Sequence, residues 1–143
     1  MFAFVAAVVL GACGHASGTE RSAVRISTAS GIVSLHVPVA DSDAARVRGL
    51  QGRTHLTVGD GMAFVFGHPT TAPFWMKGVA VPLSIAFWDG RGRIVAIMDM
   101  PPCHRGPCPT FRPKAPYVGA LEVARGWFVA HGVEVGDRVE LDR

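Results

Sequence analysis

Several features that would each indicate a particular function are missing from this sequence. It holds 14 Lys and Arg residues, of which only two are lysines, and they form no run. Nucleic-acid binding needs a clustered basic face, so we expect no nucleic-acid partner. The Gly-x-Ser-x-Gly elbow, the P-loop, the dinucleotide fingerprint and the His-Glu-x-x-His helix are all absent. These absences leave enzymatic activity open and favour a binding or accessory module over an enzyme.

The composition is that of one packed domain. A chain of 143 residues is long enough for a single core and too short for two. Hydrophobic residues make up 49% of it and charged residues 17%, so disorder is not expected. The net charge of +3 is a weak bias toward basic character. We therefore expect one small domain, acting as a monomer.

The N-terminal segment predicts export. Phe2–Leu10 is apolar throughout, which suits a signal-peptide core and is too short to span a bilayer; the alternative is a buried N-terminal strand. Small residues then precede Cys13, as in the bacterial lipobox, where the cysteine receives lipid and the peptide before it is removed. We predict a signal peptide over 1–12, lipidation of Cys13 and a flexible tether over 13–22. A domain over 23–143 would then lie outside the cytoplasm, anchored by lipid to a bacterial membrane.

The remaining two cysteines agree with export. Once Cys13 is assigned to lipid, Cys103 and Cys108 are left as an even pair. An even pair in an oxidising compartment predicts a disulfide, and the short loop between them contains the Gly and Pro that help a chain turn back on itself.

Alternating apolar residues predict a mainly β fold. In the stretch 83–88, Leu83, Ile85 and Phe87 share one face, while the other three residues share the opposite face. Asp41 or Ser42 can cap a short helix that reaches about residue 50 and turns Val47 and Leu50 to the core, and 126–131 predicts a second helical turn. About seven short strands in all predict a small single-domain β-sandwich or partly closed barrel with one or two short helices.

Several separate motifs occur in the order typical of one family. The central ones are Phe74-Trp75-Met76-Lys77, Ile85-Ala86-Phe87, Pro101-Pro102-Cys103, Pro107-Cys108-Pro109 and Gly136-Asp137. Those upstream are Gly49-Leu50, Gly52-Arg53, Gly61-Met62 and Phe64-Val65-Phe66. Over roughly 33–141 the chain resembles the domain-of-unknown-function 192 family. The resemblance implies a small, mostly β domain, often exported, with no established activity. Gly78 stands where the family usually has Asn, and Ser84 where it usually has Asp.

One lone cation in an apolar stretch marks a candidate ligand site. Trp75 and Lys77 lie two residues apart, so in a strand they share one face, with Phe74 and Met76 turned to the core. A flat aromatic wall beside a polar group is a common way to orient a small ligand. We predict that Trp75 and Lys77, with Asp99 or the Cys103–Cys108 loop at the rim, bind an unknown small ligand or a protein partner. No cofactor is required by this hypothesis.

Metal handling is the main alternative function. Met98, Met100, Cys103, His104 and Cys108 lie close together in the sequence, and thioether, thiolate and imidazole ligands suit Cu(I). Against copper, methionine usually fills core space, and an oxidised cysteine pair has no thiolates. A hydrolase of unrecognised type is a third possibility, because His104 adjoins Cys103.

Overall fold

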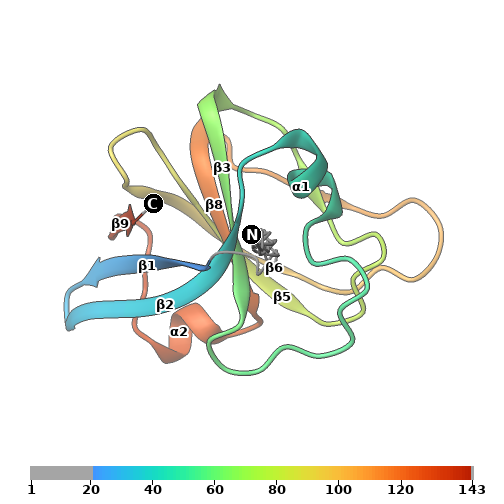
Figure 1. The fold of residues 1–143 in the computed structure, drawn as a ribbon, viewed down its shortest axis with the longest axis horizontal. Coiled ribbons are helices and arrows are strands. Elements are labelled where there is room, and N and C mark those ends of the chain that lie inside the picture. The colour runs from blue at the N-terminus through green and yellow to red at the C-terminus, as the bar shows by residue number, and fades with distance from the viewer. Residues whose placement is uncertain (1–20, 143) are drawn as a thin grey trace, which may run out of the picture.

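The computed structural model describes residues 21–142. The predicted signal peptide, Cys13 and the tether up to residue 20 lie outside these residues. The described part forms the elements β1 (Arg21–Thr28), β2 (Gly31–Ala40), α1 (Asp43–Arg48), β3 (Gly61–Thr70), β4 (Phe74–Trp75), β5 (Leu83–Trp88), β6 (Ile94–Met100), β7 (Thr110–Phe111), β8 (Tyr117–Ala124), α2 (Trp127–Ala130) and β9 (Arg138–Leu141) (Figure 1). The prediction of a mainly β domain with one or two short helices is confirmed.

Seven of the strands form one mixed sheet. Their order is β6-β5-β8-β3-β2-β1-β9, and β4 and β7 form a separate two-stranded sheet. All neighbours in the large sheet are antiparallel except β2 and β3, which pair in parallel over two residues. Its edge strands β6 and β9 meet at a single bridge between Arg93 and Arg138, so the sheet curls without closing into a barrel.

The β1–β2 hairpin marks where the chain enters the described domain. Its register pairs Arg21 with Pro38 and continues to the turn at Gly31. Residues 21 and 22, which the sequence analysis assigned to the tether, are therefore already part of a strand.

Among residues 21–142, no helix combines the length and the apolar character needed to cross a membrane.

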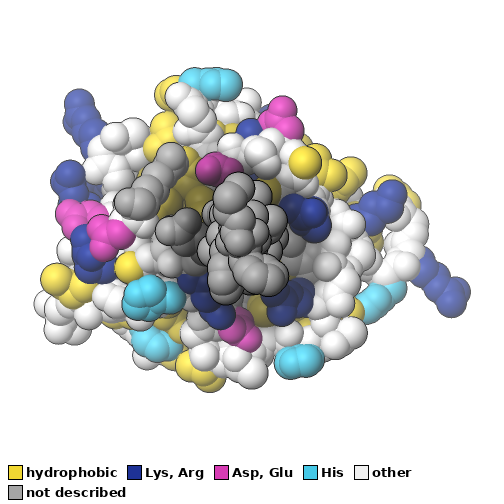
Figure 2. Space-filling model, viewed as in Figure 1, with side chains coloured by type: hydrophobic (Ala, Val, Ile, Leu, Met, Phe, Trp, Pro, Cys, Tyr) yellow, Lys and Arg dark blue, Asp and Glu magenta, His cyan; other side chains and the backbone are white. Residues whose placement is uncertain are grey.

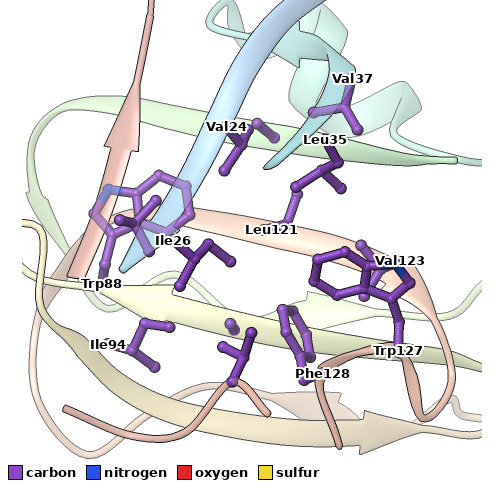
Figure 3. Close-up of a cluster of buried hydrophobic side chains, with 14 residues drawn as sticks. Val24, Ile26, Leu35, Val37, Trp88, Ile94, Leu121, Val123, Trp127 and Phe128 are labelled. Carbon is purple, nitrogen blue, oxygen red and sulfur yellow. The ribbon is translucent and has the colours of Figure 1, made fainter. Parts of the chain in front are cut away.

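Strand β5 separates two hydrophobic cores. All six of its residues are buried, and they alternate between the two sides as the sequence predicts. Ala86 and Trp88 belong to the tryptophan core, which also holds Trp127 and Phe128 of α2 (Figure 3). Leu83, Ile85 and Phe87 belong to the phenylalanine core on the other side. Each large apolar side chain buried in this way contributes about 1.5–3 kcal/mol.

The phenylalanine core is built on edge-to-face aromatic contacts. Phe74 stands perpendicular to Phe64, with 4.9 Å between the ring centres, and Tyr117 packs edge-on to Phe87 at 4.8 Å. The Tyr117 hydroxyl donates a hydrogen bond to the carbonyl of Ala72, and burial raises the pKa of Tyr117 to about 12. This contact ties the chain just before β4 to the large sheet.

Helix α1 agrees with its prediction at the start and departs from it inside. Ser42 caps the helix, because its side chain accepts a hydrogen bond from the Ala45 N–H at 3.3 Å. Leu50 is buried as expected, but Val47 is 68% exposed. The prediction for Val47 assumed that Val47 and Leu50 lie on one face of the same helix, and it was wrong. The helix ends at Arg48, so Leu50 reaches the core from the turn that follows the helix.

Candidate functional site

A pocket of about 350 Å³ opens between α1 and the chain around β4. It lies over the phenylalanine-core side of the large sheet, where β8 and β3 form its base. In Figure 1, α1 lies above this region at one side of the sheet. The lining residues are Asp43, Arg46, Val47, Arg48, Gly49, Leu50, Gln51, Phe64, Phe66, Ala72, Pro73, Phe74, Trp75, Lys77, Val79 and Glu122. A smaller hollow lies next to it; Leu50 lines both, and Arg21 also lines the hollow.

Arg46 fixes α1 against the sheet. Its guanidinium donates to the Val65 carbonyl at 2.7 Å and to the Asp43 carboxylate at 2.6 Å. It also lies over the Phe66 ring, 5.0 Å from the ring centre. These contacts occupy both terminal nitrogens of the guanidinium and pair its charge with Asp43. Arg46 is therefore a structural wall of the pocket more than a free anion receptor.

The small β4–β7 sheet places Trp75 and Lys77 at the mouth of the pocket. Trp75 pairs with Thr110, and Lys77 forms an isolated bridge with Cys103. Trp75 is 51% exposed, and the Lys77 ammonium lies 5.8 Å from the centre of its ring. Such an exposed cation–π contact is worth about 0.5–1 kcal/mol. Among residues 21–142, no carboxylate lies within ion-pair distance of Lys77, so its charge is available to a ligand.

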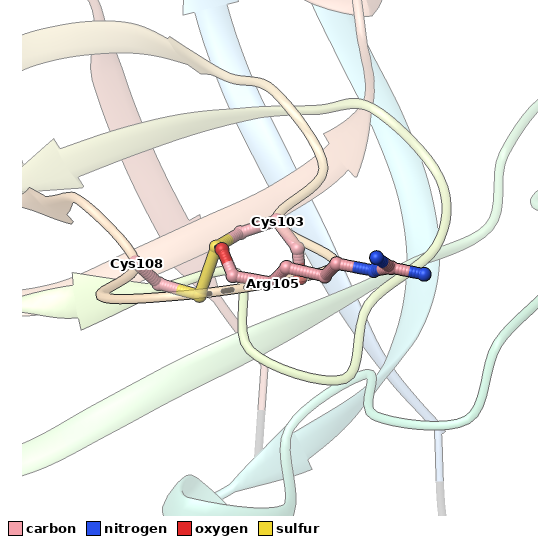
Figure 4. Close-up of a disulfide and its surroundings, with 3 residues drawn as sticks. All are labelled: Cys103, Arg105 and Cys108. Carbon is pink, nitrogen blue, oxygen red and sulfur yellow. Dashed lines mark hydrogen bonds between the residues drawn. A yellow bond between two sulfur atoms is a disulfide. The ribbon is translucent and has the colours of Figure 1, made fainter.

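The predicted disulfide between Cys103 and Cys108 is confirmed. The two Cα atoms lie 5.7 Å apart, and the bond closes the loop between β6 and β7. Figure 4 shows the Arg105 side chain leading away from the disulfide. The loop is joined to the pocket wall through the bridge between Cys103 and Lys77, but none of its residues lines the pocket.

The structure does not bring Asp99 to Trp75 and Lys77. Asp99 faces Ser84 across β5 and β6, on the tryptophan-core side of the sheet. Its carboxylate accepts hydrogen bonds from the Ser84 hydroxyl at 2.7 Å and from Arg125 at 3.2 Å. The same hydroxyl accepts the Gly126 N–H at 3.0 Å. Asp99 and Ser84 thus hold the entry to α2 and lie on the far side of the sheet from the pocket.

The candidate metal ligands are arranged as packing residues. Met100 is fully buried in the phenylalanine core, Met98 packs against that core, and both cysteines are joined in the disulfide. His104 is exposed. Within residues 21–142, no group of three or more His, Cys, Asp and Glu side chains is placed to hold a metal ion. Copper handling remains a prediction from the sequence alone.

Glu122 is a site residue that the sequence reasoning missed. It lies on β8 between Met62 of β3 and Ile85 of β5, and it is 4% exposed. Burial raises the pKa of Glu122 to about 8. No hydrogen bond or ion pair reaches its carboxyl from residues 21–142, and Glu122 is one of the residues that line the pocket. The available signal was an acidic residue inside the apolar run of β8.

On the face shown in Figure 2, Lys and Arg side chains are distributed around the molecule with Asp and Glu among them. They do not gather there into one basic patch. Positive charge at the pocket is therefore local, contributed by Lys77 at the mouth and Arg48 on α1.

The fold and the pocket define a small, single-domain, β-rich module with an aromatic-walled cavity. The chain belongs to the domain-of-unknown-function 192 family, described as uncharacterized ACR, which matches residues 24–141. This confirms the resemblance carried by the motifs. No curated protein matches the chain.

Two solved structures share the fold. A Sinorhizobium meliloti protein, provisionally described as a transcription regulator, is 31% identical with a TM-score of 0.77, over 86% of this chain and 95% of that one. A protein of unknown function from Novosphingobium aromaticivorans is 28% identical with a TM-score of 0.79, over 88% of this chain and 89% of that one. Both crystal structures support the same small β-rich architecture for this chain.

Proposed function

We propose that this protein is a small-ligand-binding module whose pocket takes organic anions with an apolar body. The observation that carries the proposal is the 350 Å³ pocket, which joins an aromatic interior to the exposed cation Lys77. We also propose that lipid on Cys13 holds the module at the outer side of a bacterial membrane, as the sequence predicts. The ligand would be small, because the pocket is at the low end of the range for drug-sized sites.

The interior of the pocket favours an apolar body. Phe64, Phe66, Phe74 and Trp75 present ring surface, and Leu50 and Val79 close the sides. Phe64, Phe74 and Phe87 hold one another in edge-to-face contact and form a rigid wall. Little side-chain conformational entropy is therefore lost when a flat ligand enters.

The mouth of the pocket favours an anion. Lys77 and Arg48 are both exposed and both line the pocket, while Arg46 and Asp43 neutralise each other. A ligand with its charged group at the mouth and its apolar body inside satisfies both regions at once. This arrangement supports a binding module more than a catalyst.

The description of the Sinorhizobium meliloti protein raises nucleic-acid binding as another function. The present chain has no basic run in its sequence, and its cations are dispersed on the face in Figure 2. Binding to a phosphate backbone requires several clustered cations. We therefore do not extend transcriptional regulation to this chain.

The proposal is tested with a pair of fluorescent probes. 8-Anilinonaphthalene-1-sulfonate carries an anion on an apolar body, and N-phenyl-1-naphthylamine has the same rings without the sulfonate. Lys77→Gln should weaken sulfonate binding about fivefold, as expected for one exposed charge pair, and leave the neutral probe unchanged. Trp75→Ala should weaken both probes.

Lys114→Gln is the matched control, because Lys114 is the other lysine and does not line the pocket. It should change neither dissociation constant. Melting temperatures are measured for every variant, so that probe binding to unfolded chain is recognised. Equal effects of Lys77→Gln and Lys114→Gln, or no binding of either probe to the folded protein, would refute the proposal.

A further inference from the structure

Glu122 occupies the base of the pocket at the centre of the sheet. Strand β8 lies between β5 and β3, so a side chain on the pocket side of β8 lies in the middle of the pocket base. Its cross-strand neighbours Met62 and Ile85 are apolar and offer it no hydrogen bond. With 4% of its surface exposed, Glu122 is the least exposed charged or polar side chain that lines the pocket.

A buried carboxyl in this position needs a partner that the described chain does not supply. Carboxyl groups out of contact with water are normally hydrogen-bonded, because leaving one unpaired costs about 1–3 kcal/mol. Within residues 21–142, the Glu122 carboxyl has no hydrogen-bond partner, and the residue lines the pocket. Water or a ligand in the pocket can therefore supply the partner of this carboxyl.

The surroundings decide whether this carboxyl donates or accepts. The other charged groups that line the pocket are Asp43, Arg46 and Arg48 of α1 and Lys77 beyond β4. Strands β3 and β5 present only apolar side chains to it, through Met62, Phe64 and Ile85. Burial among these groups raises the pKa of Glu122 to about 8, with no opposing contribution from the cations at the mouth. At neutral pH the group is a carboxylic acid with one O–H to donate.

We infer that Glu122 is a hydrogen-bond donor at the base of the pocket, and that the ligands are organic anions whose apolar body ends in a neutral acceptor. A ketone, ester or amide oxygen at the inner end would receive the Glu122 proton, while the anionic group stays with Lys77. This inference rests on the proposed function and narrows it to one chemical class of ligand.

Two isosteric probes separate the inference from the proposed function. 4-Acetylbenzenesulfonate carries a ketone oxygen where 4-isopropylbenzenesulfonate carries a methyl group. Each is titrated by displacement of 8-anilinonaphthalene-1-sulfonate at pH 6 and at pH 9.5. In the ratio of the two dissociation constants, the contribution of the cations at the mouth cancels, because both probes present the same sulfonate to them.

At pH 6 the ketone should bind about 5–10 times more tightly than its isostere, the value of one buried hydrogen bond. At pH 9.5 the preference should disappear, because an ionised Glu122 accepts and does not donate. Glu122→Gln keeps an N–H donor without a titrating proton, so its preference should persist at both pH values. Glu122→Leu should show no preference at either.

Equal binding of the two sulfonates to the wild-type protein at pH 6 overturns the inference and leaves the proposed function standing. A preference that is the same at both pH values in the wild type also overturns it. Failure of all three sulfonates to bind the folded protein overturns the inference together with the proposed function. The wild-type measurements decide the matter even if a Glu122 variant fails to fold.

Discussion

Gly119 allows strand β8 to pass directly beneath the indole of Trp88. A Cβ atom at this position would lie 2.1 Å from Trp88 Cζ2, inside the contact distance of any two carbon atoms. Trp88 is 7% exposed in the tryptophan core, so it has no space into which to move. We predict that Gly119→Ala lowers the free energy of unfolding by about 1–3 kcal/mol, the usual effect of overpacking.

Urea denaturation measures this change, with Gly67→Ala as the control. Gly67 also lies in a strand, but nothing lies within 4 Å of a Cβ built there. The control should change stability by less than 1 kcal/mol. Equal stability of the two variants would contradict the assigned packing of Trp88.

Glu122 should make stability fall as pH rises. The folded chain holds its proton up to about pH 8, while an unfolded chain releases it near its ordinary value of 4.5. Between these values only the folded state binds the proton, so the free energy of unfolding falls by up to about 1.4 kcal/mol per pH unit and levels off above pH 8. Asp60 and Asp89, whose pKa values are lowered by hydrogen bonds, act in the opposite direction but below pH 4.

The measurement compares melting temperatures of wild-type protein and Glu122→Gln from pH 5 to pH 8.5. The glutamine variant lacks the titrating proton, so the difference between the two proteins isolates Glu122. Parallel curves over this range would show that Glu122 is not buried as described.

At the scale of elements, the disulfide loop and the β4–β7 sheet act together. Cys103 is bridged to Lys77, and closing a loop of this size contributes about 2 kcal/mol by restricting the unfolded chain. We predict that Cys103→Ser with Cys108→Ser lowers the free energy of unfolding by about that amount and weakens probe binding at the pocket mouth. Denaturation and probe titration measure the two effects. Two free thiols in oxidised wild-type protein would contradict the disulfide.

Gly78 lies just after β4 in the chain. Its backbone φ is +77°, in the left-handed region that suits glycine and asparagine. A Cβ there would lie 3.5 Å from the Gln51 side chain, which is an ordinary contact. The family's usual Asn therefore fits this backbone. We predict that Gly78→Asn changes the melting temperature little, while the β-branched Gly78→Val lowers it clearly. Similar melting temperatures for the two variants would contradict the left-handed conformation.

The sequence predicts elements where a local rule is enough. Alternation in 83–88 located β5 and the sides of its residues, and Ser42 located the start of α1. Trp75 and Lys77 were found for the same reason, because residues two apart share a strand face. Val47 was misplaced because its exposure depends on where a very short helix ends.

The pocket itself could not be predicted in this way. Its walls come from α1, β4 and β8, which are distant in sequence and are brought together only by the β2–β3 parallel pairing and the strand order. A glutamate on a strand ordinarily faces solvent, and no local pattern in the sequence shows that Glu122 is buried. The sequence offered Asp99 as one possible rim residue, but strand alternation does not say which face of the sheet the pocket covers, and Asp99 lies opposite Ser84 on the other face.

At the scale of the whole molecule, the anchor remains a prediction. If Cys13 is lipidated, the full chain should sediment with membranes and Cys13→Ser should release it into the soluble fraction. A mass increase equal to the acyl groups confirms the modification directly. Cys108→Ser, which leaves Cys13 intact, is the control and should stay with the membrane. Retention of Cys13→Ser on membranes, with no added mass in the wild type, would contradict the anchor.

The register of the β1–β2 hairpin determines how far a membrane-held N-terminus can lie from the pocket. Arg21 pairs with Pro38, five residues before α1 begins at Asp43, and the hollow beside Arg21 shares Leu50 with the pocket. Seven residues separate Cys13 from Arg21, and such a segment spans at most about 29 Å. A lipidated chain would thus hold its pocket close to the bilayer surface. A ligand carried in that surface would then meet the pocket at a high effective concentration.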